Sequence, residues 1–337
     1  MAGTADGPVL IVSVGATPGW RSAARELAGA FARAGAPVVT VSTGPVPDVR
    51  TFMLTDLVQA GAARRAAREA IGRVRPSAIV YCSMTAALLW PRPGAIWLDT
   101  LAAENRPGRH GVWQRVVERR RVAGATLLLT MAPQSLAPLD GRRHAEAVEV
   151  PVAVEASGPP AAVRDLDVLA YTADPVKRRL EFILEAWRRA RRGEETLLVA
   201  GIEAARASAA GRSVPGVRFL GRLDPEEYRA LLRRTRVFVA APRREDFGIA
   251  PLEALADGAM LVTTPAPGPY PALEIARRLD PRLVADDLAP ALRAALDAPA
   301  ADYAVRAAAL VRPYSREAVT LTISERVLPH LMPGLMR

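Results

Sequence analysis

The segment REDFGIAPLEALADG, residues Arg244–Gly258, gives the clearest indication of the fold. An apolar run over Val237–Ala241 precedes it and predicts a buried strand that ends at Pro242. After an acidic loop, Pro251 is expected to be the first residue of a helix, where its missing N–H costs no hydrogen bond. Gly258 is expected to be the C′ residue that ends this helix. A strand, a loop and a helix in this order direct backbone N–H groups towards the crevice above a parallel sheet, where a phosphate binds.

The alternation of strands and helices continues on both sides of this stretch. Apolar runs predict further strands over Val9–Val14, Val38–Ser42, Ala78–Cys82, Ala95–Leu98, Thr126–Thr130, Val168–Tyr171, Thr196–Ala200, Val217–Leu220 and Leu261–Thr264. Amphipathic or charged patterns predict helices over Ser22–Arg33, Ala60–Val74, Val112–Ala123, Arg179–Arg191, Asp224–Thr235 and Ser315–Leu331. Alternating strands and helices build parallel sheets, and residues 148–164 lack either pattern. The sequence therefore predicts an α/β protein with two doubly wound domains that face each other across a cleft and are joined by a linker at 148–164.

Length and composition exclude several classes of protein. The 337 residues allow two domains, and a composition of 50% hydrophobic and 24% charged residues is typical of a globular protein. No apolar run reaches the roughly 18 residues of a membrane-spanning helix, and no basic region precedes the first apolar run, so we expect a cytoplasmic protein without a signal peptide. The single cysteine, Cys82, excludes a disulfide framework or a cysteine-based zinc site within one chain.

Positive charge is concentrated in the first half. The net charge is +10, and residues 1–150 hold 18 arginines against 11 acids. Such a half attracts a phosphorylated ligand, an anionic membrane surface or nucleic acid, unless it is only a solvated arginine-rich surface. We do not expect nucleic acid, because RGG runs, zinc-finger spacing and interleaved aromatic and basic residues are absent. Lys177 is the only lysine among 45 basic residues, which indicates, unless it is chance, a position that needs a compact ammonium rather than a guanidinium.

The second half resembles glycosyltransferase family 4, also called glycosyl transferases group 1, the retaining GT-B enzymes that use nucleotide-sugar donors. The family motif E-x-F-G-φ-x-x-x-E-A-φ-A-x-G holds two glutamates separated by seven residues, and its positions are matched here by Glu245, Phe247, Gly248, Glu253, Ala254, Ala256 and Gly258. The segment YTADPVKRRLEFILEAW resembles the family's diphosphate-binding segment and places Lys177 at its lysine. The resemblance is strong over residues 165–265 and weaker over residues 1–150.

The resemblance implies a fold and a reaction. The fold would be GT-B, with a Rossmann-like acceptor-side domain over 1–150, a Rossmann-like donor-side domain over 151–314 and a helix over 315–337 that returns to the first domain. The reaction would be retaining, metal-independent transfer of a hexose-type sugar from a UDP- or GDP-linked donor to an unidentified acceptor, without a cofactor. The partners would be the nucleotide sugar and the acceptor, and the basic first domain leaves open peripheral contact with the anionic inner face of a membrane.

Breaking a sugar–diphosphate bond builds positive charge on the sugar ring and negative charge on the diphosphate. By resemblance, Lys177 and the N–H groups around Gly248–Leu252 would stabilise the diphosphate. Glu253, expected in the first turn of its helix, would accept hydrogen bonds from the ribose hydroxyls, and Glu245 would face the transferring sugar. The implied donor-binding residues are Gly19, Lys177, Arg222, Phe247, Gly248, Ile249, Leu252 and Glu253.

The first half departs from the family at the expected catalytic contact. The run WLD that ends at Asp99 lacks the usual histidine after its strand, so Asp99 is expected to contact a sugar hydroxyl instead. Asp99 is grouped with Glu245 and Lys177 as the catalytic residues. His110, in a polar loop, is the acceptor-side candidate, with simple solvent exposure as the alternative. Glu253 has the alternative of a helix-start acid, and Glu245 that of a solvated acidic loop.

Two functions from other classes stay open. Ala173 stands where the family has an arginine, and the loop Pro265–Pro271 lacks a common Gly-Gly pair and the glutamate that follows it. These departures leave open a GT-B protein that binds a nucleotide sugar without turnover. An NAD-dependent oxidoreductase also uses doubly wound domains, but the first turn, GATPG, is not G-x-G-x-x-G and no acid follows at the expected strand end. Gly19 in that turn has the alternative of a plain strand–helix turn.

Overall fold

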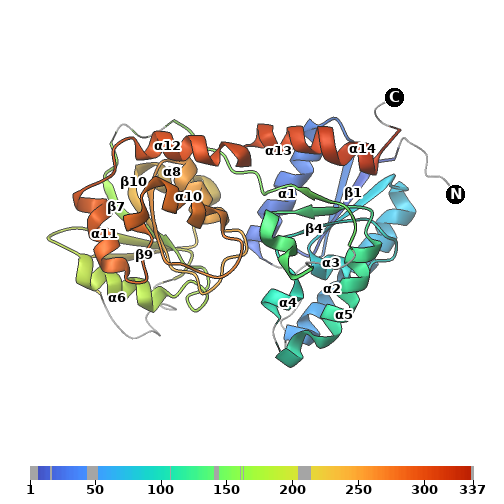
Figure 1. The fold of residues 1–337 in the computed structure, drawn as a ribbon, viewed down its shortest axis with the longest axis horizontal. Coiled ribbons are helices and arrows are strands. Elements are labelled where there is room, and N and C mark those ends of the chain that lie inside the picture. Colours follow the sequence, from blue (N-terminus) through green and yellow to red (C-terminus); the bar gives the residue numbers. More distant parts are fainter. Residues whose placement is uncertain are drawn as a thin grey trace. The chain divides into compact units, whose positions relative to one another are not determined.

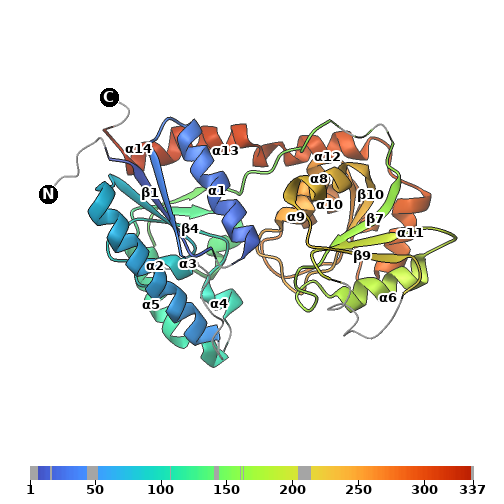
Figure 2. The same ribbon diagram turned by 180° about the vertical axis from the view of Figure 1, so that it is seen from behind.

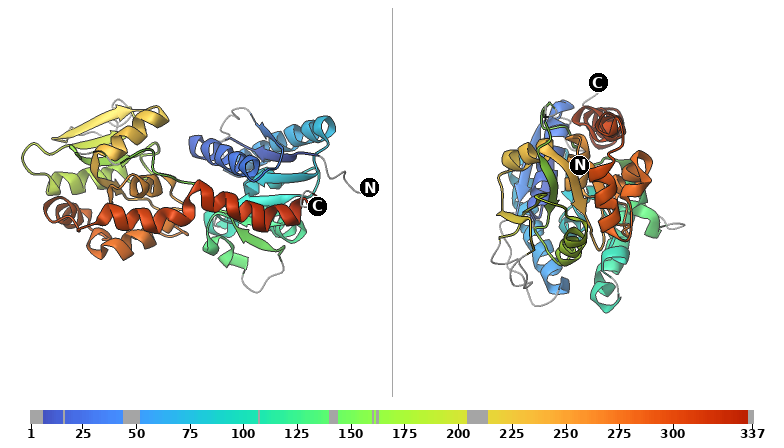
Figure 3. Two further views of the ribbon diagram at one scale, coloured as in Figure 1. Left: turned by 90° about the horizontal axis from the view of Figure 1, so that it is seen from above. Right: turned by 90° about the vertical axis from the view of Figure 1, so that its left-hand side faces the viewer.

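The computed structural model describes residues 7–15, 17–43, 52–106, 108–139, 144–159, 161, 163–203 and 214–334. The chain divides into two compact units, the first made of Met1–Ala153 with Tyr314–Arg337 and the second of Val154–Pro313. Each unit contains one parallel sheet with helices on both of its faces, which Figure 1 and Figure 2 show from opposite sides and Figure 3 shows from above and from one end. The predicted α/β class with two doubly wound domains is confirmed.

The first unit is built on a six-stranded sheet in the order β2-β1-β3-β4-β5-β6. Its strands are β1 Val9–Ser13, β2 Val38–Ser42, β3 Ala78–Cys82, β4 Ala95–Leu98, β5 Leu128–Thr130 and β6 Ala147–Glu149. Its helices before the C-terminal segment are α1 Pro18–Arg33, α2 Phe52–Val74, α3 Met84–Ala87, α4 Ala102–Asn105 and α5 Val112–Gly124, with 3₁₀ turns at Gly108–Gly111 and Pro133–Leu139. Every residue of β1, β3, β4 and β5 is buried, as expected of a parallel sheet that helices cover on both faces.

The second unit is built on a five-stranded sheet in the order β11-β10-β7-β8-β9. Its strands are β7 Leu166–Tyr171, β8 Leu197–Ala200, β9 Val217–Gly221, β10 Thr235–Ala240 and β11 Met260–Thr263. Its helices are α6 Leu180–Ala190, α8 Pro225–Arg234, α9 Ile249–Ala256, α10 Pro271–Leu279, α11 Leu288–Asp297 and α12 Tyr303–Val311, with 3₁₀ turns at Pro281–Leu283 and Arg312–Tyr314. β7 and β10 are central neighbours, and Val168 lies opposite Val237. The helix start predicted at Asp224 is confirmed, because Asp224 and Glu227 form a reciprocal capping box.

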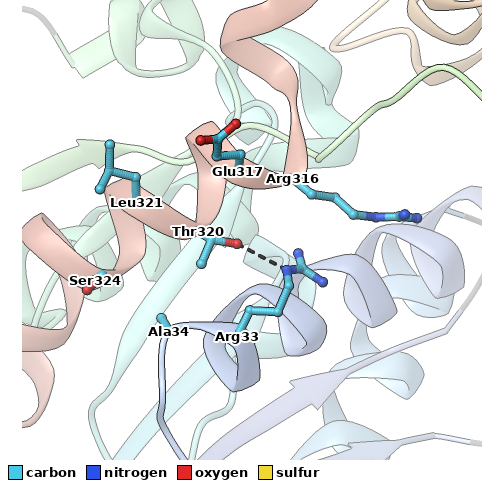
Figure 4. Close-up of a pocket in the computed structure, with 7 residues that line it drawn as sticks. All are labelled: Arg33, Ala34, Arg316, Glu317, Thr320, Leu321 and Ser324. Carbon is cyan, nitrogen blue, oxygen red and sulfur yellow. Dashed lines mark hydrogen bonds between the residues drawn. The ribbon is translucent and has the colours of Figure 1, made fainter.

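The C-terminal segment packs against α1 in the first unit. It consists of α13 Arg316–Thr322, a π turn at Ile323–Val327 and α14 Leu328–Leu331. The guanidinium of Arg316 donates two hydrogen bonds to the Glu26 carboxylate, at 3.0 and 2.9 Å. Arg33 Nε donates to Thr320 Oγ1 at 3.1 Å, across a cavity of about 550 Å³ that Figure 4 shows between the two helices. These contacts explain why the end of the chain belongs to the first unit.

Several predicted boundaries are wrong, and each error has a local cause. Helix α2 begins at Phe52 rather than near Ala60, because its first turns expose their aliphatic residues and so show no amphipathic pattern. Pro251 is the third residue of α9 rather than the first, since Gly248 turns the chain two residues earlier than expected. The first two residues of the predicted linker, 148 and 149, belong to strand β6, Ala147–Glu149. Gly258 is confirmed as the residue after the C-cap, with φ +81°.

Candidate functional site

The second sheet has a topological switch point between β7 and β10. The chain runs outward from β7 to β8 and β9, and then returns to the other side of β7 to form β10 and β11. The loops that follow β7 and β10, residues 172–179 and 241–248, therefore leave neighbouring strands at the same edge of the sheet in opposite directions. In open α/β sheets, ligands bind in the crevice at such a point, outside the carboxyl ends of the strands.

Hydrogen bonds join these two loops. The Arg243 amide donates to Lys177 O at 2.9 Å, and Arg243 Nε donates to Val176 O at 3.1 Å. Arg178 Nη1 donates to Glu245 Oε2, and the Glu245 residue is only 7% exposed. The structure thus brings Lys177 and Glu245, two of the predicted site residues, onto adjoining loops at the switch point of the sheet.

The two cations of the first loop have different surroundings. The Lys177 side chain is 76% exposed, and its Nζ lies 4.0 Å from Asp174 Oδ2, a pairing that contributes little at such exposure. The Arg178 side chain is 33% exposed, and burial lowers the pKa of its guanidinium, opposed by the nearby Tyr270 and Tyr171 hydroxyls. Lys177 is therefore a solvated charge, whereas Arg178 is partly removed from water and held by a carboxylate.

The start of α9 supplies backbone N–H groups to the same crevice. Gly248 caps the helix in the left-handed conformation, with φ +84°. The amides of Ile249 and Ala250 have no partner within the helix because they lie in its first turn. Pro251 has no N–H, and the Leu252 amide already donates to Gly248 O at 3.3 Å. Of the stretch Gly248–Leu252 that was expected to bind an anion, only Ile249 and Ala250, at its start, offer amides that no bond within the helix occupies.

A loop that follows β11 covers Glu245. The Glu245 amide donates to Pro267 O at 3.0 Å, and a Cβ atom on Gly268, whose φ is +108°, would lie 2.2 Å from Glu245 O. Tyr270 is 1% exposed at a φ of +29°, and its hydroxyl lies 2.9 Å from Thr263 Oγ1. Burial raises the Tyr270 pKa to about 12. Gly268 and Tyr270 were not predicted as site residues, although the run PGPYP marked the loop as unusual.

Glu253 lies in the second turn of α9, not the first turn as expected, so it is not a helix-start acid. Arg229 Nη1 donates to Glu253 Oε1 at 3.2 Å, and Arg229 Nε donates to Asp257 Oδ2 at 2.7 Å. Asp257 is 3% exposed and also accepts from the Ser157 amide at 2.7 Å. Although burial opposes it, the hydrogen bond to Asp257 and the charge of Glu253 raise the Arg229 pKa. Arg229, which the sequence did not single out, therefore fixes where Glu253 points.

Three further donor-side predictions lie in different surroundings. Arg222 is exposed and follows β9, the edge strand, two strands away from β7. Phe247 is 4% exposed and Leu252 is fully buried, so both side chains pack in the core. The β7 and β10 loops thus hold Lys177 and Glu245 close together, whereas Arg222 follows a strand at the edge of the sheet.

The candidates in the first unit follow different strands of its sheet. That sheet has its own switch point between β1 and β3. Gly19 is the second residue of α1, after the loop that leaves β1, and Thr17 caps this helix by accepting from the Trp20 amide at 3.2 Å. Asp99 is half-buried after β4, and its Oδ1 accepts from the Thr100 amide at 2.7 Å. The His110 side chain lies outside the described residues.

Two buried carboxylates near the loop that contains His110 were not predicted as site residues. Asp56 is 4% exposed and accepts from Arg106 at 2.8 and 3.2 Å and from the Gln114 amide group. Glu118 is 3% exposed and accepts from the Ala102 amide at 2.8 Å. Burial raises the Glu118 pKa to about 7. These bonds fix α4 against α2 and α5.

Among the described residues, no three His, Cys, Asp or Glu side chains gather in a way that could hold a metal ion. None of the helices in that part of the chain combines the length and hydropathy that crossing a bilayer requires.

Sequence comparison identifies the unit that holds the crevice. Residues 167–302 match the family described as Glycosyl transferases group 1. The second unit is a group 1 glycosyl transferase domain. A 56-residue segment is 54% identical to a phosphatidyl-myo-inositol mannosyltransferase of Propionibacterium freudenreichii subsp. shermanii, and this segment covers 16% of the present chain and 15% of that protein.

Solved structures resemble the whole chain. A sucrose-phosphate synthase from Thermosynechococcus elongatus superposes with a TM-score of 0.76 at 18% identity, over 95% of this chain and 98% of that one. WaaG, a glycosyltransferase involved in lipopolysaccharide biosynthesis, superposes with a TM-score of 0.65 at 13% identity, over 97% of this chain and 98% of that one. At these identities the likeness shows the fold, and the fold is GT-B as predicted.

Proposed function

We propose that this chain is a retaining, metal-independent glycosyltransferase that moves a hexose-type sugar from a UDP- or GDP-linked donor to an acceptor. The observation that carries the proposal is the pair of loops at the switch point of the group 1 domain. Residues 172–179 and 241–248 together contain five cations and three carboxylates, namely Lys177, Arg178, Arg179, Arg243, Arg244, Asp174, Glu245 and Asp246. A diphosphate complements this excess of positive charge.

The chemistry follows from where charge develops. The bond between the sugar C1 and the diphosphate oxygen breaks, and its electron pair leaves with the diphosphate. The Lys177 ammonium and the Ile249 and Ala250 amides would stabilise that negative charge. The acceptor hydroxyl oxygen forms the new bond to C1 on the face that the diphosphate leaves, and its proton passes to the departing diphosphate. Retention of configuration follows from this geometry.

Two carboxylates would orient the donor. Glu253, which Arg229 holds at 3.2 Å, would accept hydrogen bonds from both ribose hydroxyls. Glu245 would lie against the ring on which positive charge develops, where a carboxylate stabilises the transition state. Asp99, in the first unit, would contact a hydroxyl of the same sugar, and His110 would serve the acceptor.

A donor-turnover assay tests the proposal. Purified protein is mixed with UDP- and GDP-sugars, with and without a panel of acceptors, and release of the nucleotide is measured with a chelator present. Release that continues in the chelator, with the anomeric configuration of the donor kept in the product, is the expected result. Tight donor binding without release across the panel would favour a binding protein. Thermal stabilisation by NAD, but not by UDP- or GDP-sugars, would favour an oxidoreductase.

We also propose that the first unit contacts anionic lipid at the inner face of a membrane. Its α2 and α5 expose a set of aliphatic side chains to between 42% and 54%, namely Leu54, Leu57, Val58, Val112 and Val116. The hydrogen bond from Gln114 to Asp56 ties these stretches together, and residues 1–150 supply an excess of arginine. Flotation with vesicles containing phosphatidylglycerol tests this. Leu57→Asp should reduce binding, and equal binding to neutral vesicles would refute the role of charge.

A further inference from the structure

Arg178 stands out among the charged residues of the switch-point crevice. It lies next to Lys177 in the loop after β7 and donates from Nη1 to Glu245, 67 residues later in the chain. Its side chain keeps 33% of its exposure, so a ligand in the crevice has access to it. A guanidinium carries five N–H donors. The bond to Glu245 uses one of them, and the described residues supply no hydrogen-bond partner for the other four.

We propose that Arg178 is a second phosphate-binding cation of the donor site, held ready by Glu245 and acting together with Lys177 on the diphosphate. The inference rests on the proposed function, because it assigns a residue to the same donor site. A partly desolvated charge interacts more strongly with an anion than a solvated one does. The planar guanidinium also binds two phosphate oxygens at once, which an ammonium cannot do.

Because their exposures differ, Lys177 and Arg178 contribute differently to diphosphate binding. The Lys177 side chain is 76% exposed, so water and dissolved salt screen any contact between its ammonium and a phosphate. Arg178 is oriented before any ligand arrives, because Glu245 is itself fixed by the hydrogen bond from its amide to Pro267 O. Such preorganisation lowers the entropy lost on binding. Arg178 therefore contributes more to diphosphate affinity than Lys177 does.

Arg179 provides a matched control. It carries the same charge one residue later, but its guanidinium carbon lies 3.9 Å from the centre of the Phe182 ring in α6. The Arg179→Gln substitution removes one positive charge from the same loop without removing the group that faces Glu245. Any general effect of net charge on anion binding is thus measured separately from the effect of Arg178.

The experiment is calorimetric titration of the full chain with UDP and GDP, and with uridine and guanosine. Arg178→Gln should weaken the better nucleoside diphosphate by roughly ten- to hundredfold, the range for a hydrogen bond between charged groups, and leave its nucleoside unchanged. Arg178→Lys should lie between the two, and Arg179→Gln should change affinity by less than about threefold, because the Arg179 guanidinium lies against the Phe182 ring rather than against Glu245. Unchanged diphosphate affinity in Arg178→Gln, with the wild type binding, would overturn the inference.

Glu245→Gln separates phosphate binding from a structural role. If Arg178 binds phosphate, Glu245→Gln keeps or raises diphosphate affinity, and the double variant is as weak as Arg178→Gln. If Arg178 only holds Glu245 in place, both single variants lose affinity alike, and the inference fails. The double variant also removes the carboxylate that Arg178→Gln leaves buried and unpaired, so it keeps the test possible even if Arg178→Gln alone fails to fold. A wild type that binds neither UDP nor GDP would refute the proposed function itself.

Discussion

Gly268→Ala is the sharpest test of how the loop after β11 supports Glu245. The added Cβ atom would lie 2.2 Å from Glu245 O and 2.9 Å from the Glu245 carbonyl carbon. Both neighbours are backbone atoms, so no side chain can rotate away. Gly268 also has a φ of +108°, where a residue with a side chain is strained. Either the substituted loop keeps its place under strain, or it moves and releases Glu245.

The expected cost has two parts. A side chain at such a backbone conformation costs about 1–2 kcal/mol, and forcing an extra methyl group into a packed contact costs about 1–3 kcal/mol. Gly268→Ala should therefore lower the free energy of unfolding by about 2–5 kcal/mol if the loop stays in place. Gly193→Ala is the control, because Gly193 in the same unit has a φ of +51° but nothing within 4 Å of its Cβ position. Gly193→Ala should therefore show only the cost of the backbone conformation, about 1–2 kcal/mol.

Urea unfolding followed by tryptophan fluorescence measures both variants, and UDP or GDP titration reports on the crevice. If the loop moves instead, the stability loss shrinks, but the bond from the Glu245 amide to Pro267 O at 3.0 Å breaks and donor turnover falls. A Gly268→Ala variant that matches Gly193→Ala in stability and keeps wild-type turnover would refute the reasoning. That result would mean that the loop does not lie against Glu245 in the working protein.

Three other variants test separate parts of the structure. Because the Glu118 pKa is raised to about 7, above an ordinary value of about 4.3, the folded state holds a proton that the unfolded chain releases. Stability should therefore fall as pH rises from about 4.3 to 7 and then level off; Glu118→Gln should remove this slope in urea titrations, and a difference independent of pH would contradict the burial argument. Lys177→Ala should lose roughly 2–4 kcal/mol of transition-state stabilisation in kcat/KM, with Lys177→Arg between it and the wild type, and wild-type turnover would refute its role. Arg229→Met should cost about 3–5 kcal/mol of stability, because Asp257 stays buried without its cation, and should weaken nucleoside binding through Glu253; loss of stability alone would show that Arg229 does not position Glu253.

Local sequence signals predicted the fold well where a single segment carries all the information. The helix start at Asp224 and the C′ glycine at Gly258 are both as expected, because each depends on residues within one helical turn. The predicted start of α2 was wrong for the opposite reason. Its first turns expose Leu54 and Leu57, so the apolar periodicity that marks a helix on a core is missing there.

The candidate site was predictable only in part. Lys177 and Glu245 followed from a motif, and whether they bind the donor stays a prediction. Arg229 and Tyr270 had no such signal, because what distinguishes them is contact with residues distant in the sequence. Arg229 reaches Glu253 from 24 residues earlier, and the Tyr270 hydroxyl meets Thr263 at the end of a strand. A pattern read along one segment contains no information about which segments the fold brings together.

Arg178 shows what the strand order adds to the sequence. Among 45 basic residues the sequence singled out Lys177 because a lysine is rare in this chain. Rarity says nothing about burial, however, and electrostatic strength depends on burial and geometry. The pairing of β7 with β10 places the loop of Arg178 against the loop of Glu245, and that pairing follows from the order of the sheet rather than from either loop. The arginines of this chain are alike in the sequence, and their different environments in the fold are what make one of them a candidate for phosphate binding.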